Sequence, residues 1–372
     1  MKDTGEPMDS KEALRLAVQT AAANNDVVYD VKDRPSIMVR IPKFAISEVM
    51  EGGSDEVHPA FLVNGREVDE IYLSKYEASM DDGLAYSLPG VLPKGEITFD
   101  EAIAACEGKG PGWHLMTNAE WAAILLWCRK NGTVPHGNVH FGKELEPVRS
   151  AIPADYGVEE EAGRIARVLT GTGPLHWTHD GTAGGIWGLR GNLVQMIGGV
   201  RTSYGEIQII PDNDAAAGAD QAPDSGEWRA ILQDGSLVPP GTAGTLKVQY
   251  VEDAAENQDV IWKGVGAGGK WVVTTEVTRR HEGSQSGDFH RMAAAPGVEI
   301  PEILKTLLLF PADDGKYGGR IFLDNAAPDQ IFNRADAHHA LPGGGAFYYS
   351  GRGDRNRRLK AVGFRLAYLP PV

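Results

Sequence analysis

The chain has 372 residues, which accommodates one large or two ordinary domains with a sizeable buried core, at about 150 residues per domain. Hydrophobic residues make up 42% and charged residues 23%, while 46 Gly and 22 Pro indicate many turns and disfavour a helical bundle or coiled coil. The 36 Lys and Arg against 51 Asp and Glu give a net charge of −15, which repels phosphate backbones and anionic membranes, so nucleic acid is disfavoured as a partner.

The first predicted element is a short amphipathic helix over residues 10–23, with Ser10 as its cap. Its apolar stripe consists of Leu14, Leu16, Ala17, Val18 and Ala21. Polar residues interrupt the apolar character of this region, so we expect no signal-directed export. We assign residues 1–36 to an attachment or assembly segment and expect the body of the protein over residues 37–372.

The body begins with predicted strands. Apolar and β-branched residues alternate with other residues through 37–41, and similar patterns occur around 60–63 and 70–76. Half-buried strands show this alternation because successive side chains point to opposite faces of a sheet.

Two predicted helices follow, and each begins with a capping box, in which a Thr side chain accepts from an amide three residues later and a Glu reaches back. The boxes are Thr98 with Glu101 and Thr117 with Glu120. The apolar stripes expected to enter the core are Ala102, Ile103, Ala105 and Cys106 in the first helix, and Trp121, Ile124, Leu125 and Cys128 in the second.

These two cysteines are the only ones, so a disulfide framework is excluded, and we expect both to be reduced core thiols. The longest apolar run, residues 122–127, is far shorter than the ~20 residues that a membrane span needs. We therefore expect a soluble protein without membrane insertion.

Beyond about residue 170, short strand-like segments are broken by Gly and Asp, which predicts a Gly-rich β region with long loops. Residues 211–244 are too long for a simple turn and are predicted to form a loop-rich insertion. Residues 264–269 match a dinucleotide-binding fingerprint, but a strand-like segment follows where that motif needs a helix N-terminus. We expect a hairpin turn there.

Two groups of residues have metal-ligating side chains. His176 and His179 lie three apart beside Asp180, but the surrounding glycines disfavour a helix and favour loop histidines with local hydrogen bonds. Asp212, Asp214 and Asp220 offer oxygen ligands for a structural Ca²⁺, although the Gly and the closing Glu of an EF-hand loop are missing. This Ca²⁺ is the only cofactor that we consider, and no nucleophile motif indicates an enzyme.

The C-terminal segment differs in composition from the rest of the chain. Residues 333–360 hold six Arg and Lys against two Asp, in a chain of net charge −15, and they also hold His338, His339 and three aromatic side chains. Tyr, Arg and His anchor many binding interfaces, and glycine spacers between them shape loops. The segment therefore predicts a binding surface, with a solvated charged edge as the alternative.

Several segments resemble one fold. Residues 112–121 are similar to the Trp-x-Leu-x-Thr-x-x-Glu-Trp signature of the C-type lectin fold of the formylglycine-generating-enzyme kind. Residues 191–196 look like its Gly-Asn-Val-Trp-Glu-Trp turn, and residues 362–365 look like its closing strand. The resemblance implies an α/β fold of the α+β type, with two helices packed on twisted, mostly antiparallel sheets.

Within this superfamily the chain most resembles the variable proteins of diversity-generating retroelements, in particular phage tail receptor binders. Residues 331–334, 345–348, 354–355 and 363–365 are similar to the framework of their C-terminal variable region, here 331–365. Arg334, Ala335 and Asp336 stand where the family has Arg-Gly-Gly. The resemblance implies hypervariable, ligand-facing positions at Ala337, His338, His339, Leu341, Tyr348, Tyr349, Ser350, Arg352, Arg357 and Leu359.

The resemblance implies an adhesin rather than an enzyme, which binds a host cell-surface protein or glycan. We expect it in the virion as part of a phage tail, as a homo-oligomer such as a trimer in contact with other tail proteins; the alternative locations are the bacterial cytoplasm and the cell surface. Two rival functions stay open. One is a metal-dependent oxidase or sulfoxide synthase of the same fold that uses His176, His179 and nearby carboxylates, and the other is a purely structural tail protein.

Overall fold

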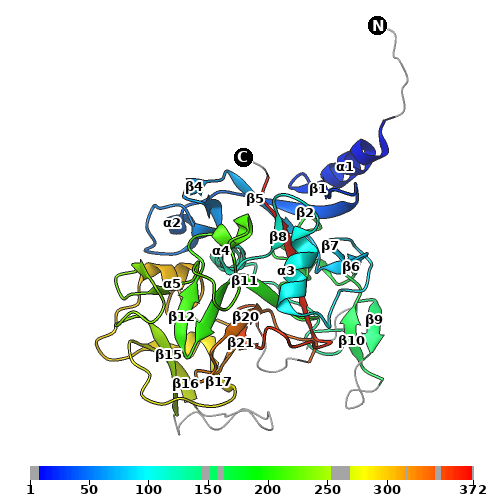
Figure 1. Cartoon of the computed structure of the whole chain (residues 1–372). Helices are drawn as coiled ribbons and strands as arrows, with labels where there is room; N and C mark the ends of the chain where they lie inside the picture. The colour runs from blue at the N-terminus through cyan, green and yellow to red at the C-terminus, as the bar shows by residue number, and fades with distance from the viewer. Residues whose placement is uncertain are drawn as a thin grey trace.

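Strands dominate a mixed α+β fold (Figure 1). The computed structural model describes residues 8–144, 151–156, 163–252, 269–315, 317–339 and 345–370, and the side chains of Tyr156 and Arg352 lie outside this description. Within these residues, no helix combines the length and the apolar character needed to cross a membrane.

A five-stranded sheet brings together the two ends of the described chain. Its strands, in spatial order, are β1 (Asn25–Tyr29), β2 (Pro35–Pro42), β5 (Glu70–Ser74), β23 (Leu366–Tyr368) and β8 (Trp113–Leu115). All of its neighbouring strands are antiparallel. The strand predicted at 37–41 is confirmed within β2, and the one at 70–76 is confirmed as β5. Because β1 pairs with β2, part of the expected N-terminal segment belongs to this sheet.

A twelve-stranded sheet forms the rest of the scaffold. Its main path is β17 (Gln285–Asp288), β19 (Arg320–Leu323), β21 (Tyr349–Gly353), β20 (Gln330–Arg334), β11 (Val194–Ser203), β12 (Glu206–Ile209), β15 (Lys247–Glu252), β16 (Gly269–Thr274) and β18 (Ala293–Ala294). The strand β22 (Val362–Phe364) pairs in parallel with β11, and two other pairs are parallel. The remaining pairs are antiparallel, so the prediction of mostly antiparallel sheets is confirmed.

Three small hairpins complete the described strands. They are β3 (Leu62–Val63) with β4 (Arg66–Glu67), β6 (Ser79–Asp81) with β7 (Leu84–Tyr86), and β9 (Pro153–Tyr156) with β10 (Ile165–Val168). The strand predicted around 60–63 is only partly present, because residues 59–61 form a 3₁₀ turn in which His58 Nδ1 accepts from the amide of Ala60 at 3.1 Å.

The two central helices begin as predicted. In α3 (Phe99–Glu107), the Thr98 hydroxyl accepts from the Glu101 amide at 3.3 Å, and the Glu101 carboxylate accepts from the Thr98 amide at 3.0 Å. The same reciprocal pair at Thr117 starts α4 (Asn118–Asn131). α3 packs against β7 and β8, and α4 packs against β11 (Figure 1).

Three further helices are shorter or more exposed: α1 (Ser10–Ala21), α2 (Ile46–Val49) and α5 (Glu302–Thr306). The N-cap of α1 is Asp9 without a side-chain bond, so Ser10 is its first helical residue and not its cap. No residue of α1 is buried, and the Arg15 guanidinium ties the helix to Asp26 of β1 through two bonds of 2.6 Å.

The largest apolar cluster joins α4 to the twelve-stranded sheet, and Trp121, Ile124 and Leu125 lie in it as predicted. Cys106 and Cys128 are buried and unbridged, which confirms the expected core thiols. Burial raises the pKa of both, so neither is a reactive thiolate.

The segment 211–244 is an ordered part of the large sheet. It contributes β13 (Arg229–Ile231), which pairs with β12, and β14 (Leu237–Val238), which pairs with β13. Trp228 is 1% exposed and donates its indole N–H to the carbonyl of Ala222 at 2.9 Å. At the expected glycine hairpin, residues 264–268 lie outside the described residues, and β16 begins at Gly269 as the strand-like pattern predicts.

Candidate functional site

The C-terminal segment 331–365 has a buried framework. Among the residues expected to be fixed, the buried ones are Ile331, Phe332, Asn333, Arg334, Ala346, Phe347, Arg355, Gly363, Phe364 and Arg365. Asp354 is exposed and Tyr348 is half-buried. β20 and β21 each have a paired neighbour on both sides, so the segment is held inside the large sheet.

The expected ligand-facing positions do not share one environment. Arg357 and Leu359 are exposed, and His339 and Tyr348 are half-buried. The expectation of a ligand-facing side chain is wrong for four buried residues: Ala337, His338, Tyr349 and Ser350. Leu341 and the side chain of Arg352 lie outside the described residues.

Tyr348 and Tyr349 differ because only Tyr349 is packed into the core. Tyr349 is the first residue of β21, which lies between β19 and β20, whereas Tyr348 precedes the strand. The Tyr349 ring stacks on Phe332 with centroids 5.2 Å apart, and its hydroxyl donates to Met292 Sδ at 3.4 Å. Burial raises the pKa of Tyr349, as expected for a core phenol.

Three of the basic side chains in this segment have acidic partners. Arg355 Nη1 lies 2.6 Å from Asp100 Oδ1, Lys360 Nζ lies 2.8 Å from Asp155 Oδ1, and Arg358 pairs with Glu101. Arg334 is fully buried. The local positive charge that the sequence predicts is therefore largely neutralised by carboxylates from distant segments, and Arg357 is the exposed cation to which no described carboxylate is paired.

A buried arginine, Arg334, lies at the end of β20 and ties this strand to neighbouring segments. The Arg334 guanidinium donates to Asn118 Oδ1 at 2.6 and 3.1 Å and to the carbonyls of Leu307 and Leu308 at 3.2 and 3.1 Å. It also lies 4.9 Å from the centre of the Tyr349 ring. Burial lowers the pKa of Arg334 to about 10, so it remains charged at neutral pH.

A second buried arginine fixes the end of the segment. Arg365 donates to the Ser74 carbonyl at 2.7 Å, to Gln195 Oε1 at 3.1 Å and to the Trp187 carbonyl. Glu77 lies in the same buried region and accepts from Asn192 Nδ2 at 2.9 Å. The turn residue Asn192 has a φ of 64°, which Asn tolerates better than most side chains.

Replacing Glu77 with glutamine is expected to change how stability depends on pH. Burial raises the pKa of Glu77 from 4.5 to about 7, so the folded protein keeps a proton that the unfolded chain has released. The stability that this proton contributes is full below the unfolded pKa and is lost as pH rises through 7. Glutamine stays neutral, so relative to wild type the Glu77→Gln variant should gain about 2 kcal/mol between about pH 5 and about pH 8.

Urea unfolding of both proteins across this range measures the difference. A difference in unfolding free energy that stays constant with pH would show that Glu77 is ionised in the folded state throughout.

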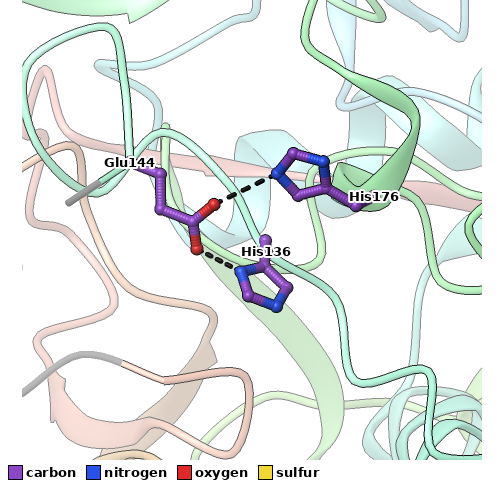
Figure 2. A group of neighbouring side chains, drawn as sticks. All are labelled: His136, Glu144 and His176. Atoms are coloured by element: carbon purple, nitrogen blue, oxygen red, sulfur yellow. Dashed lines mark hydrogen bonds and ion pairs between the residues drawn. The ribbon is translucent and has the colours of Figure 1, made fainter. Parts of the chain in front are cut away.

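A second group of polar side chains lies near the start of the C-terminal segment 331–365. His136, Glu144 and His176 each offer one ligand atom, and these atoms lie within 4.8 Å of one another. Figure 2 shows the Glu144 carboxylate between the two imidazoles. One of its oxygens is bonded to His136 Nδ1, and the other lies 3.2 Å from His176 Nε2.

Backbone contacts hold these segments together. The His136 amide donates to the carbonyl of His176 at 3.2 Å, which places both histidines side by side. At Gly137, an added Cβ would lie 1.8 Å from the Arg190 carbonyl, so only glycine allows this close approach. The Arg190 guanidinium lies 3.7 Å from Glu144 and 3.8 Å from Asp336, a buried carboxyl whose pKa burial raises to about 6.

The sequence singled out His176 as a metal-ligating side chain together with His179, but the structure groups His176 with His136 and Glu144. His179 is buried, accepts from the Ile186 amide at 2.8 Å, and has its pKa lowered to about 4 by burial. The predicted local hydrogen bond is confirmed for His179, which does not belong to the group. His136 and Glu144 were missed because no spacing rule joins them to His176, which is 32 residues beyond Glu144.

The three carboxylates expected to hold Ca²⁺ are not brought together in the described residues. In the part of the chain that the structure describes, His136, Glu144 and His176 are the only close group of three or more metal-ligating side chains, so Asp212, Asp214 and Asp220 do not converge. Asp214 Oδ1 accepts from the Asn64 amide at 2.5 Å, and Asp220 Oδ1 accepts from the Ala222 amide at 2.9 Å. Both carboxylates accept from loop amides, and the bond from Ala222 to Asp220, two residues apart, is that of an Asx turn.

No protein-family model matches the chain, and no curated protein sequence is significantly similar to it.

Proposed function

We propose that the protein is a ligand-binding protein with a C-type-lectin-like scaffold, whose C-terminal segment presents a diversified surface to a receptor on a bacterial cell. In this proposal it is an adhesin of a phage tail, diversified by a retroelement. Its ligand is a cell-surface protein or glycan. The side chains proposed to contact this ligand are Tyr348, Arg357, Leu359 and His339.

The observation that carries the proposal is the exposed run at 356–359, because Ala337, His338, Tyr349 and Ser350 are buried and take no part in the proposed surface. The positions that resemble the family framework are almost all buried, while exposed side chains cluster at 356–359 between them. A binding surface that must change in sequence without unfolding needs this separation, because surface substitutions usually change stability by less than about 0.5 kcal/mol.

A backbone angle gives further support. Ala335 has a φ of 59°, in the left-handed region that favours glycine. The related variable regions have glycine at this position. The angle at Ala335 is one that glycine adopts more easily than alanine, which supports the alignment of this position with the glycine of the family.

Replacing three side chains of the surface together should abolish binding. The test variant carries Tyr348→Ala, Arg357→Ala and Leu359→Ala, because a few Tyr and Arg side chains usually carry most of the binding free energy. The matched control carries Arg66→Ala, Tyr204→Ala and Val251→Ala, all at exposed positions outside the segment. Labelled proteins are applied to a panel of intact bacterial strains and to an array of bacterial surface glycans.

We expect wild type and control to bind at least one strain or glycan, and the test variant to lose at least tenfold in apparent affinity. Circular dichroism checks that all three proteins are folded. Equal binding by the folded test variant would place recognition elsewhere, and the absence of binding by wild type across the panel would count against a receptor-binding role.

The retroelement is tested independently at the DNA level. A near-identical copy of the 3′ end of the coding sequence, differing at adenines and adjacent to a reverse transcriptase, is expected beside the gene. Its absence would remove diversification from the proposal but leave ligand binding to the assay above.

A metal-dependent oxidase is the second candidate function. The observation that favours it is the group of His136, Glu144 and His176, since two histidines and one carboxylate are the donor set of non-haem iron oxygenases. Stoichiometric iron or copper in the purified protein would favour this candidate over the adhesin.

A further inference from the structure

We propose that His136, Glu144 and His176 form a binding site for a divalent first-row transition metal ion, with Zn²⁺ as the best fit to the donor set (Figure 2). The inference is independent of the proposed receptor-binding function. It concerns a surface site beside the variable region and not the variable side chains themselves.

The donor atoms are the ones that such an ion prefers. Zn²⁺ binds neutral imidazole nitrogens and carboxylate oxygens at about 2.0–2.2 Å, so that ligand atoms in a tetrahedral site lie about 3.3 Å apart. His176 Nε2 already lies 3.2 Å from Glu144 Oε2, and all three donor atoms lie within 4.8 Å of one another. An ion would replace the two hydrogen bonds of the Glu144 carboxylate and take the space between the three donor atoms.

Backbone contacts bring the segments that carry the two histidines together. The three contacts are the amide of His136 on the carbonyl of His176, the close packing of Gly137 on Arg190, and a bridge between Asn138 and Gly191. The imidazole planes are tilted by 83° with centroids 5.3 Å apart, so the two rings are not stacked. Pre-positioned ligands of this kind lower the entropic cost of binding an ion.

Arg190 acts behind the carboxylate ligand. Its guanidinium lies 3.7 Å from Glu144 and 3.8 Å from the fully buried Asp336. Outer groups that hold a ligating carboxylate orient it and influence metal affinity. Because the guanidinium is shared with Asp336, its positive charge is partly offset by a second carboxyl.

The site leaves one side of the ion accessible. The side chains of His136 and His176 are 50% and 44% exposed, while that of Glu144 is 13% exposed. Three protein ligands with a solvent-facing fourth position are typical of zinc sites that bind a water molecule or an exchangeable ligand. The structure thus points to an ion that takes a water or an anionic donor in its fourth position.

The ion would also restrain the backbone near His338, at the start of the variable region. The loop between His136 and Glu144 contains Phe141, whose amide donates to the carbonyl of His338 at 2.8 Å. Arg190 connects Glu144 to Asp336, two residues before His338. A metal that fixes Glu144 therefore restrains the backbone at the beginning of the variable positions.

Calorimetric titration of the chelator-treated full-length protein with ZnCl₂ tests the site. We expect one equivalent to bind, and Mg²⁺ or Ca²⁺ in excess not to compete, because neither prefers imidazole ligands. His176→Ala and Glu144→Gln should each weaken Zn²⁺ binding at least tenfold. The matched control is His290→Ala, an exposed histidine on another segment, which should bind as wild type does.

A thermal melt with and without Zn²⁺ gives a second readout, because an ion that binds only the folded state raises the melting temperature. The raised temperature should disappear in His176→Ala and persist in His290→Ala. Lack of saturable binding by wild type, or equal Zn²⁺ affinity in His176→Ala and His290→Ala, would overturn the proposal. Neither measurement needs a receptor. A failure of the metal-site proposal can therefore be distinguished from a failure of the receptor-binding proposal.

Discussion

The Tyr349→Ala variant is expected to lose about 3–5 kcal/mol of unfolding free energy, in the range of other aromatic-to-alanine changes in protein cores. Tyr349 is 1% exposed and stacks on Phe332, and its ring makes a T-shaped contact with Phe289 with centroids 5.7 Å apart. The Arg334 guanidinium lies 4.9 Å from the centre of the ring. Removing the ring leaves a cavity next to a buried charge, so little relaxation can compensate.

The neighbouring tyrosine supplies the matched control. Tyr348 is half-buried, and Tyr348→Ala should cost less than about 1 kcal/mol. Tyr349→Phe keeps the aromatic contacts and should also be mild, because it removes only the hydroxyl that donates to Met292 Sδ. Urea unfolding followed by tryptophan fluorescence measures all three variants. A larger loss for Tyr348→Ala than for Tyr349→Ala would mean that the register of β21 is wrong.

The Trp121→Ala variant is expected to lose a similar amount, about 3–5 kcal/mol. Trp121 is completely buried in α4 and belongs to the apolar cluster that joins this helix to the large sheet. Alanine keeps the helix propensity high, so the loss reports the missing side-chain contacts and not a weaker helix.

Two variants separate these contributions. The Trp121 indole N–H donates to no described residue, so Trp121→Phe loses volume but no hydrogen bond and should cost clearly less than Trp121→Ala. Trp127→Ala, at a half-buried position of the same helix, should also cost less. Thermal and urea unfolding give the comparison, and an unchanged stability in Trp121→Ala would contradict the placement of α4 in the core.

Elements with local signals could be predicted from the amino-acid sequence. The Thr98 and Thr117 capping boxes predicted the starts of α3 and α4, because both hydrogen bonds of a box form between residues three apart. Alternation of apolar residues predicted β2 and β5 for a similar reason. The buried state of Cys106 and Cys128 followed from helical spacing.

The tertiary structure decided which side chains are buried and which converge. Composition could not separate Tyr348 from Tyr349, because the difference comes from the rings of Phe332 and Phe289 that pack on Tyr349. The partners of Arg355 and Arg358 lie 255 and 257 residues away in the chain, so the apparent basic surface is largely neutralised by side chains that no local pattern connects to it.

Contacts between distant segments also explain the outcome for the expected Ca²⁺ ligands and for the group of His136, Glu144 and His176. The Asp residues at 212, 214 and 220 are close in sequence, yet separate loop amides occupy the carboxylates of Asp214 and Asp220. His136, Glu144 and His176 come from separate loops and meet only because Gly137 packs against Arg190 and the amide of His136 bonds to His176. Hydrogen bonds between near neighbours can be predicted from the sequence, whereas burial, charge pairing and ligand geometry depend on contacts between distant segments, which only the folded chain establishes.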